Sequence, residues 1–381
     1  MRRSACDADC RGDAGNCANG SLPASSGAEC RCDEQNTKGL IVKENYTVAV
    51  VGATGLVGET MIEILEQRAF PVATLYALAS ERSVGKTIQF CGKNIKVRDL
   101  ADFDFSAVDI ALFSAGGSIS AEFAPRAGEA GCIVIDNTSH FRNEADIPLV
   151  VPEVNPGAIA DYVSHNLIAN PNCSTIQMVV ALQPIYAAVG IDRINVATYQ
   201  AVSGAGRGLV EALAGQTAAM LNGKPRELTG GEQPIAFNAI PHIDTFQENG
   251  YTREEMKMVW ETRKIFADES ILVNPTAVRI PVFYGHSEAV HIETREPISA
   301  AQVRELLAAA PGVTVIDEAR SGGYPTAVTE AARQDDVFVG RIREDISHDC
   351  GISLWVVADN VRKGAALNSV QIAEILVRDY L

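Results

Sequence analysis

Several features that would place this chain of 381 residues in a common class are missing. Lysine and arginine number 32 against 48 acidic residues, so the formal net charge is −16 and no extended basic segment occurs. Nucleic-acid-binding proteins normally carry a basic patch, so we expect no nucleic-acid partner. No apolar stretch reaches the length that spans a bilayer, so we expect no membrane segment either. The N-terminus also lacks the apolar core of a secretory signal.

The nine cysteines do not form a disulfide pattern. Five lie within the first 32 residues, whereas Cys91, Cys132, Cys173 and Cys350 are scattered along the rest of the chain. A secreted disulfide framework would show paired spacings, and no spacing here matches a zinc site, so we predict no metal site. A reducing, cytoplasmic location suits a free thiol better.

Composition divides the chain into a short first segment and a longer remainder. Residues 1–45 are rich in small and polar residues and show little hydrophobic periodicity. We predict that they form a disordered extension, although a start codon assigned too early would give the same appearance. The remainder is long enough for two domains.

The first domain is predicted to bind a dinucleotide. A β-rich run at 46–51 precedes the glycine-rich segment GATGLVG at 52–58, and an amphipathic helix is expected at 59–68. In that order the glycines allow close backbone approach, and the helix N-terminus faces a pyrophosphate. The glycine spacing departs from the commoner G-x-G-x-x-G, so a simple packing turn is the alternative. Further strands at 108–113 and 132–136, with a helix at 121–130 between them, predict a parallel α/β sheet.

A second strand, expected at 74–79, ends where such folds read the adenosine ribose. Arg82, between Ser80 and Ser83, can hold a 2′-phosphate and favours NADP over NAD. The alternatives are that Arg82 is a solvated loop residue or that Glu81 contacts a ribose hydroxyl.

Cys173 lies in the segment NPNCST, just before an apolar run at 176–182 of helical character. Asn172 or Ser174 is expected to cap that helix. The positive end of the helix dipole favours thiolate, the nucleophilic form, and backbone N–H groups at the helix start are candidate oxyanion donors. A buried structural cysteine is the alternative.

The second half of the chain shows a different pattern. Strands are expected at 194–202, 277–284, 289–294, 313–316, 337–342 and 352–357, with helices at 209–221, 252–266 and 300–309. Few crossover helices separate these strands, so we predict an α+β domain with a mixed, mostly antiparallel sheet. A closing helix at 363–380 is expected to return to the first domain. The predicted organisation is therefore an NADP-binding domain at 46–172, closed by a helix within 360–381, and a catalytic and dimerisation domain at 173–359.

Polar residues follow several of these strands. Gln200 ends one strand, and Arg279 and His286 flank another turn. An odd separation of seven positions places Arg279 and His286 on opposite faces of a continuous strand. A bend near Pro281 or Gly285 is therefore required if both side chains reach one site.

Taken together, the motifs resemble those of the aspartate-β-semialdehyde dehydrogenase family over residues 46–381. The matching segments are GATGLVG at 52, SERSVGK at 80, FSAGGS at 113, NTSHFR at 137, VPEVNP at 151, NPNCST at 170, YQAVSGAG at 199, EEMKM at 254, RIPVFYGHSE at 279 and WVVADNVRKGAALNS at 355.

The resemblance implies a role for each matching residue. Cys173 would be the acylated nucleophile, His286 the general acid/base, and Gln200 the residue that orients the substrate. Arg279 would hold the substrate α-carboxylate, Glu254 rather than Glu255 its ammonium group, and Arg142, Asn172 and Lys257 the phosphate. The implied cofactor positions are Gly52, Thr54, Gly55, Leu56, Val57, Arg82, Ser83, Ser203, Gly204 and Asn360.

The implied activity is the NADP-dependent reductive dephosphorylation of L-4-aspartyl phosphate by a homodimer, with inorganic phosphate as the second product. An N-acetyl-γ-glutamyl-phosphate reductase is the nearest alternative, but it would have no use for a carboxylate aimed at a free amine. A catalytically dead binding protein would be expected to lose Cys173 or His286.

Overall fold

The computed structural model describes residues 43–223 and 233–381. All but the last three residues of the predicted N-terminal extension lie outside the described residues. Within the described ranges, no helix is both long enough and apolar enough to cross a membrane.

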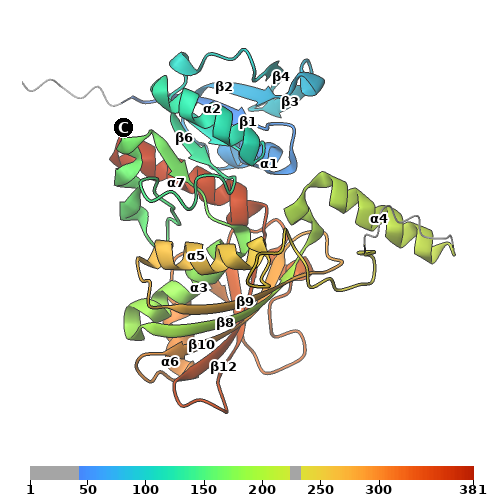
Figure 1. The fold of residues 1–381 in the computed structure, drawn as a ribbon, viewed down its shortest axis with the longest axis vertical. Coiled ribbons are helices and arrows are strands. Elements are labelled where there is room, and N and C mark those ends of the chain that lie inside the picture. Colours follow the sequence, from blue (N-terminus) through green and yellow to red (C-terminus); the bar gives the residue numbers. More distant parts are fainter. Residues whose placement is uncertain (1–42, 224–232) are drawn as a thin grey trace, which may run out of the picture. The chain divides into compact units, whose positions relative to one another are not determined.

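The first sheet, shown in Figure 1, has the strand order β3-β4-β2-β1-β5-β6-β7. All neighbouring strands are parallel except β3 and β4, which form an antiparallel pair at one edge. The strands are β1 (Tyr46–Val51), β2 (Val72–Ala79), β3 (Thr87–Phe90), β4 (Lys93–Asp99), β5 (Ile110–Phe113), β6 (Ile133–Asp136) and β7 (Leu167–Ala169). The predicted parallel α/β sheet is confirmed.

Helices cover both faces of this sheet because side chains alternate along each strand. Val48 and Val50 of β1 pack with α1 (Leu56–Gln67) and α7 (Leu367–Asp379), whereas Ala49 and Val51 pack on the side of α2 (Gly117–Glu129). The predicted closing helix begins as the short turn η6 (Arg362–Ala366) and continues as α7. Its apolar side joins the core of the first sheet, as predicted.

The second sheet has the order β11-β12-β13-β10-β8-β9. The β8–β9 and β11–β12 pairs are parallel and the other pairs antiparallel, which confirms the mixed, mostly antiparallel sheet. Its strands are β8 (Ile191–Gln200), β9 (Leu272–Arg279), β10 (His286–Thr294), β11 (Val313–Val315), β12 (Val337–Glu344) and β13 (Gly351–Ala358). The long helix α3 (Cys173–Val189) packs on one face with α5 (Arg253–Phe266) and α6 (Ala300–Ala308).

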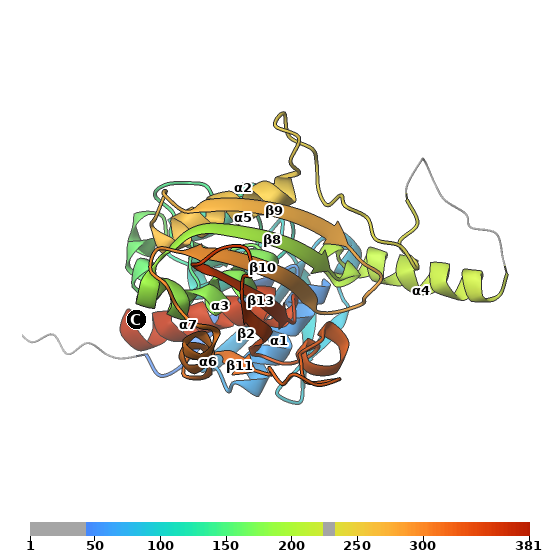
Figure 2. The same cartoon turned by 90° about the horizontal axis from the view of Figure 1, so that it is seen from below.

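Some predicted boundaries were wrong. The strand expected at 277–284 is β9, which ends at Arg279, because Pro281 cannot donate to a ladder and Gly285 turns the chain with a φ of +89°. The hairpin β3–β4 was missed because its sequence is largely polar. Helix α4 (Arg207–Leu221) points away from the sheets in Figure 2, and Leu213 is its one buried residue.

Short turns of helix complete the described part. They are η1 (Glu81–Ser83), η2 (Phe105–Ala107), η3 (Pro156–Ser164), η4 (Val202–Ala205) and η5 (Ala327–Ala331).

Candidate active site

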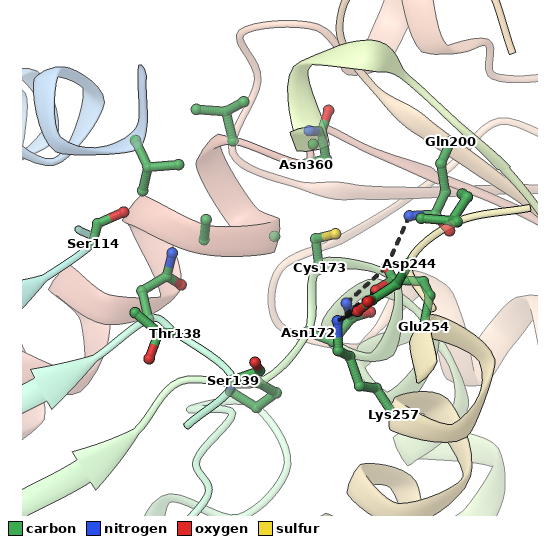
Figure 3. Close-up of a pocket in the computed structure, with 18 of the residues that line it drawn as sticks. Ser114, Thr138, Ser139, Asn172, Cys173, Gln200, Asp244, Glu254, Lys257 and Asn360 are labelled. Atoms are coloured by element: carbon green, nitrogen blue, oxygen red, sulfur yellow. Dashed lines mark hydrogen bonds and ion pairs between the residues drawn. The ribbon is translucent and has the colours of Figure 1, made fainter. Parts of the chain in front are cut away.

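Between the two sheets lies a cavity of about 490 Å³ that is lined by loops from both. Figure 3 shows the Cys173 sulfur pointing into it, with Asn360 on one side and Asn172, Gln200 and Glu254 on the other. The lining also includes Arg142, Lys257, Arg279, Ser203 and Gly204. The structure therefore brings residues from distant motifs into one space, although His286, Arg82 and Ser83 are not in its lining.

Cys173 is the first residue of α3, and Asn172 is its N-cap. The Asn172 side-chain oxygen accepts hydrogen bonds from the backbone N–H groups of Ser174 (3.0 Å) and Thr175 (3.3 Å). The backbone N–H of Asn172 donates a hydrogen bond to Glu261 Oε2 at 2.6 Å. Among the backbone N–H groups of residues 172–175, all described, only that of Cys173 has no acceptor. Of the oxyanion donors expected at the start of this helix, the Cys173 N–H is therefore the one that is available.

Burial, together with the nearby Glu254 carboxylate, raises the pKa of the Cys173 thiol to about 12, although Arg279, Arg142 and Lys257 act in the opposite direction. The expectation that the helix N-terminus favours thiolate at Cys173 is therefore wrong. Desolvation of a charge outweighs a partial charge from the helix.

Gln200, Arg279 and His286 meet at one end of the second sheet. Gln200 is paired with Arg279 in the parallel β8–β9 ladder, and His286 begins β10 on the other side of β8. The bend required between Arg279 and His286 is thus a full change of strand. Arg279 Nη1 donates to the Ala201 carbonyl at 2.6 Å, which fixes the buried guanidinium at the cavity wall.

The hydrogen bonds of His286 define its tautomer. The Ala201 N–H donates to His286 Nδ1 at 3.0 Å, so the neutral ring carries its proton on Nε2. Gln200 Nε2 lies 3.5 Å from His286 Nε2. The Gln200 amide already has two partners, because its Nε2 donates to Glu254 and its Oε1 accepts from Thr198. Burial, aided by Arg279, lowers the pKa of His286 to about 3, so the ring is uncharged near neutral pH and presents an Nε2–H donor.

Glu254 is the charged centre of the opposite wall. Its Oε1 accepts hydrogen bonds from Asn172 (2.9 Å) and Gln200 (3.0 Å), and its Oε2 accepts one from Lys257 (2.9 Å). Burial alone would raise the pKa of this carboxyl, but Lys257 and the amide donors hold the pKa at about 2. Lys257 also donates to Asp244 at 2.9 Å. Glu254 is thus ionised and aimed at the cavity.

The neighbouring Glu255 has a structural environment. Its Oε2 accepts from the backbone N–H of Thr252 at 2.6 Å in a capping box, and its Oε1 accepts from the N–H of Ala277 at 2.9 Å. Glu254, and not Glu255, lines the cavity.

Arg142 is a buried residue of the cavity lining, and one of its three side-chain nitrogens is without a partner within the described ranges. Its Nη1 donates to Glu261 at 3.1 Å and its Nη2 to the Asn137 carbonyl at 2.9 Å. The buried Nε has no partner among the described residues. A guanidinium with a spare N–H beside a thiol suits an anionic ligand.

The glycine-rich turn fits the phosphates of a dinucleotide. Gly52 has a φ of +86°, and a Cβ added there would lie 2.5 Å from the Ser114 carbonyl oxygen. Gly55 caps α1 without a side chain, so the first N–H groups of α1, from Leu56 and Val57 onward, face outward from the turn. Thr54 donates to Ser83 at 3.2 Å, which joins this turn to η1. Arg82 is exposed on η1 and has no ion-pair partner in the described part of the chain.

Ser203 and Asn360 follow strands β8 and β13 of the second sheet, and both line the cavity together with Val57 of the glycine-rich turn. Their side chains are hydrogen bonded at 3.0 Å, and Asn360 Oδ1 also accepts from the Gly285 N–H at 2.9 Å. Gly204 adjoins the catalytic groups, because a Cβ there would lie 3.2 Å from Arg279 Nη1 and 3.3 Å from His286 Nε2.

Sequence reasoning missed three contributors. Asp244 pairs with Lys257, Glu261 joins Arg142 to Asn172, and Gly364 adjoins the thiol, since a Cβ there would lie 2.8 Å from Cys173 Cβ. Gly364 stood within a recognised motif, whereas Asp244 and Glu261 carry no signal that distinguishes them from solvated charges.

Comparisons with known proteins agree with this arrangement. Residues 47–162 match the family profile "Semialdehyde dehydrogenase, NAD binding domain", and residues 182–363 match "Semialdehyde dehydrogenase, dimerisation domain". The aspartate-semialdehyde dehydrogenase of Legionella pneumophila is 63% identical over 89% of this chain and 98% of its own length. That of Vibrio cholerae, solved in complex with ASA, is 63% identical with a TM-score of 0.87, and the match covers 89% of this chain and all of that one. A Candida albicans relative solved with NADP is 26% identical, with a TM-score of 0.68 over 87% of this chain and 98% of that one.

A nucleotide-binding sheet joined to a thiol site and a dimerisation-type sheet defines an NAD(P)-dependent semialdehyde dehydrogenase. Such proteins are oxidoreductases. The chain belongs to the aspartate-semialdehyde dehydrogenase family.

Proposed function

We propose that this enzyme converts L-4-aspartyl phosphate to L-aspartate 4-semialdehyde, reversibly and with NADP, through a thioester on Cys173. The observation that carries the proposal is the thiol at the start of α3, with Arg142, Lys257 and Arg279 around the same cavity. Within amino-acid biosynthesis, the product would serve lysine formation by way of diaminopimelate, and also threonine, methionine and isoleucine formation.

Acyl transfer to Cys173 is the first step. The sulfur attacks the acyl carbon, the bond to the phosphate oxygen breaks, and the thiol proton leaves with the phosphate as hydrogen phosphate. Arg142, with its unused Nε–H, Lys257 and Asn172 are proposed to hold that phosphate. Arg142 and Lys257 also lower the pKa of the Cys173 thiol, against the effect of its burial.

The remaining polar groups are proposed to select an amino acid. Arg279 would hold the α-carboxylate, and the ionised Glu254 would hold the ammonium group. Gln200, hydrogen bonded to Glu254, would keep the acyl group in line with the thiol. A substrate with an acylated amine would offer Glu254 no ammonium group and would bring a bulky neutral amide against a buried carboxylate that is paired only with Lys257, which disfavours an N-acetylated substrate.

NADP is the proposed cofactor, with Gly52, Gly55, Leu56 and Val57 at its pyrophosphate and Arg82 at the 2′-phosphate. The Candida albicans relative solved with NADP supports this choice. Thr54, Ser83, Ser203, Gly204 and Asn360 would complete that site. When bound, the reduced cofactor supplies the hydride that reduces the thioester carbonyl.

His286 is proposed to act on the oxygen of the resulting hemithioacetal. Its Nε2–H can donate a hydrogen bond to the oxyanion, together with the Cys173 N–H, without any change of the ring. When the oxyanion collapses to the aldehyde, the C–S bond breaks, Cys173 leaves as thiolate, and a proton from solvent restores the thiol. Accepting the thiol proton would require the ring to turn or to lose its Nε2 proton first. The donor role is therefore the more direct one in this arrangement.

We further propose that residues 46–172, with the helix within 360–381, bind the cofactor, and that 173–359 serve catalysis and dimerisation in a cytoplasmic homodimer. The profile match to a dimerisation domain supports this division.

A phosphate-dependent assay tests the proposal. L-Aspartate semialdehyde, phosphate and NADP should yield NADPH, with little product when phosphate is omitted. Replacing the substrate by N-acetyl-L-glutamate semialdehyde should abolish turnover. Equal rates with the two aldehydes, or rates independent of phosphate, would overturn the assignment.

A further inference from the structure

Glu261 is a buried carboxylate that no motif and no cavity wall includes. It lies on α5, seven positions after Glu254, and therefore on the same side of the helix. Its residue is 1% exposed, and both oxygens are used: Oε1 accepts from Arg142 Nη1 at 3.1 Å, and Oε2 accepts from the Asn172 backbone N–H at 2.6 Å.

The two partners of Glu261 belong to two different parts of the site. Arg142 reaches the cavity from the loop after β6 and is otherwise fixed by one hydrogen bond to the Asn137 carbonyl. Asn172 immediately precedes the nucleophile and caps its helix. One carboxylate therefore spans the distance between the cation of the phosphate site and the backbone turn that carries the thiol.

We infer that Glu261 is a positioning residue for the phosphate step, because it fixes Arg142 relative to Cys173. The inference rests on the proposed function, in which Arg142 binds phosphate. Charge-assisted hydrogen bonds in a desolvated site are strong and directional, so they hold a guanidinium in one orientation. Without Glu261 the Arg142 guanidinium keeps only its hydrogen bond to the Asn137 carbonyl and is free to rotate. The turn at Asn172 also loses the acceptor of its backbone N–H.

Glu255 supplies a matched control on the same helix. It is also a buried glutamate with both oxygens occupied, but both of its donors are backbone N–H groups outside the cavity. Glu255→Gln and Glu261→Gln each keep the side-chain size and leave one amide N–H₂ facing a donor. The two variants should therefore lose comparable stability if both glutamates are only structural.

The experiment measures KM for phosphate, semialdehyde and NADP in the oxidative direction, together with Tm. For E261Q we expect KM for phosphate to rise about tenfold, as for a lost hydrogen bond to a charged group, with the other two KM values changed less than about twofold. For E255Q we expect a lower Tm and an unchanged KM for phosphate. An unchanged KM for phosphate in E261Q would overturn the inference.

Arg142→Lys separates this inference from the proposed function. If R142K leaves KM for phosphate unchanged, the phosphate assignment of Arg142 fails. If R142K raises it and E261Q does not, only the positioning role fails. In the double variant E261Q should add less than about twofold, because it acts through the guanidinium already removed. Should E261Q not fold, E261D, which keeps the charge but cannot reach both partners, should raise the same KM, and an unchanged value there would also overturn the inference.

Discussion

Cys173 combines a nucleophilic atom with an environment that raises the pKa of its thiol, because desolvation and the Glu254 carboxylate disfavour the thiolate. The cations Arg279, Arg142 and Lys257 act in the opposite direction and limit that rise.

Cys173→Ala should abolish turnover and leave NADPH binding near its normal affinity, because the cofactor loops do not depend on the sulfur. Incubation of the native enzyme with L-4-aspartyl phosphate should add an acyl mass to the peptide that contains Cys173. Cys132→Ala is the control, because burial raises the pKa of that thiol as well. An acyl label on Cys132 or Cys350 would contradict the assignment.

Arg82→Ala should weaken NADPH binding by roughly 1.5–3 kcal/mol, the range for a hydrogen bond to a charged group, and should affect NADH little. Only NADPH carries the 2′-phosphate. Titrating both cofactors by nicotinamide fluorescence gives the two affinities. An equal loss for NADH and NADPH would mean that Arg82 does not read the 2′-phosphate.

Lys257→Met should move the acid limb of the pH profile upward. Glu254 has a depressed pKa of about 2, so it stays ionised well below neutral pH, and Lys257 is the main group that opposes its desolvation. Removing that cation raises the pKa of Glu254, and ammonium binding is then lost at a higher pH. The measurement is kcat/KM for the semialdehyde between about pH 4 and 8. Lys257→Arg keeps the charge and should leave the limb in place; a shift in both variants, or in neither, argues against the electrostatic explanation.

At the scale of elements, α3 and η6 must approach very closely for the thiol to face the cavity. Gly364 makes that approach possible, since a Cβ there would lie 2.8 Å from Cys173 Cβ and 3.3 Å from its Cα. The second contact is backbone, which cannot move aside as a flexible side chain can.

Gly364→Ala should therefore displace the start of α3 and cost about 1–3 kcal/mol of stability or transition-state binding, the usual range for overpacking. We expect kcat to fall about tenfold to a hundredfold while the circular dichroism spectrum stays native. Gly215→Ala on α4 meets nothing within 4 Å and should leave kcat unchanged. Normal activity in G364A would show that the two elements can separate without loss.

At the scale of the whole molecule, the second sheet has one face that α3, α5 and α6 do not cover and that η5 covers only near β13. Ala197, Ala289 and Trp355 form a row across β8, β10 and β13 and are all partly exposed, whereas the alternate residues Val196 and Val290 are buried. A dimer with twofold symmetry would cover such a face.

Ala289→Arg should therefore convert a dimer to monomers, because it places a charge in the middle of that face. Sedimentation equilibrium at micromolar concentration should give twice the 40.6 kDa chain mass for the native protein and the single mass for the variant. Glu66→Arg, on the exposed side of α1, should remain dimeric. A native protein at the single chain mass would refute the dimer.

Local patterns in the sequence predicted the class of each sheet, the glycine turn, a helix cap at Asn172 or Ser174 and the family. Each depends on neighbouring residues: hydrophobic alternation fixes which face of a strand is buried, and a Pro-Asn turn before an apolar run fixes where a helix begins. The two carboxylates of α5 could also be separated in advance, because helical spacing places Glu254 with Lys257 on one face.

Only the tertiary structure decided how these pieces act on one another. The pKa of Cys173 depends on burial and on charges from Arg142, Lys257 and Arg279, which lie far apart in the chain. The tautomer of His286 depends on the Ala201 N–H from another strand, and the role inferred for Glu261 depends on contacts across 119 and 89 positions. Desolvation and long-range hydrogen bonds are properties of packed space, so a one-dimensional pattern does not specify them.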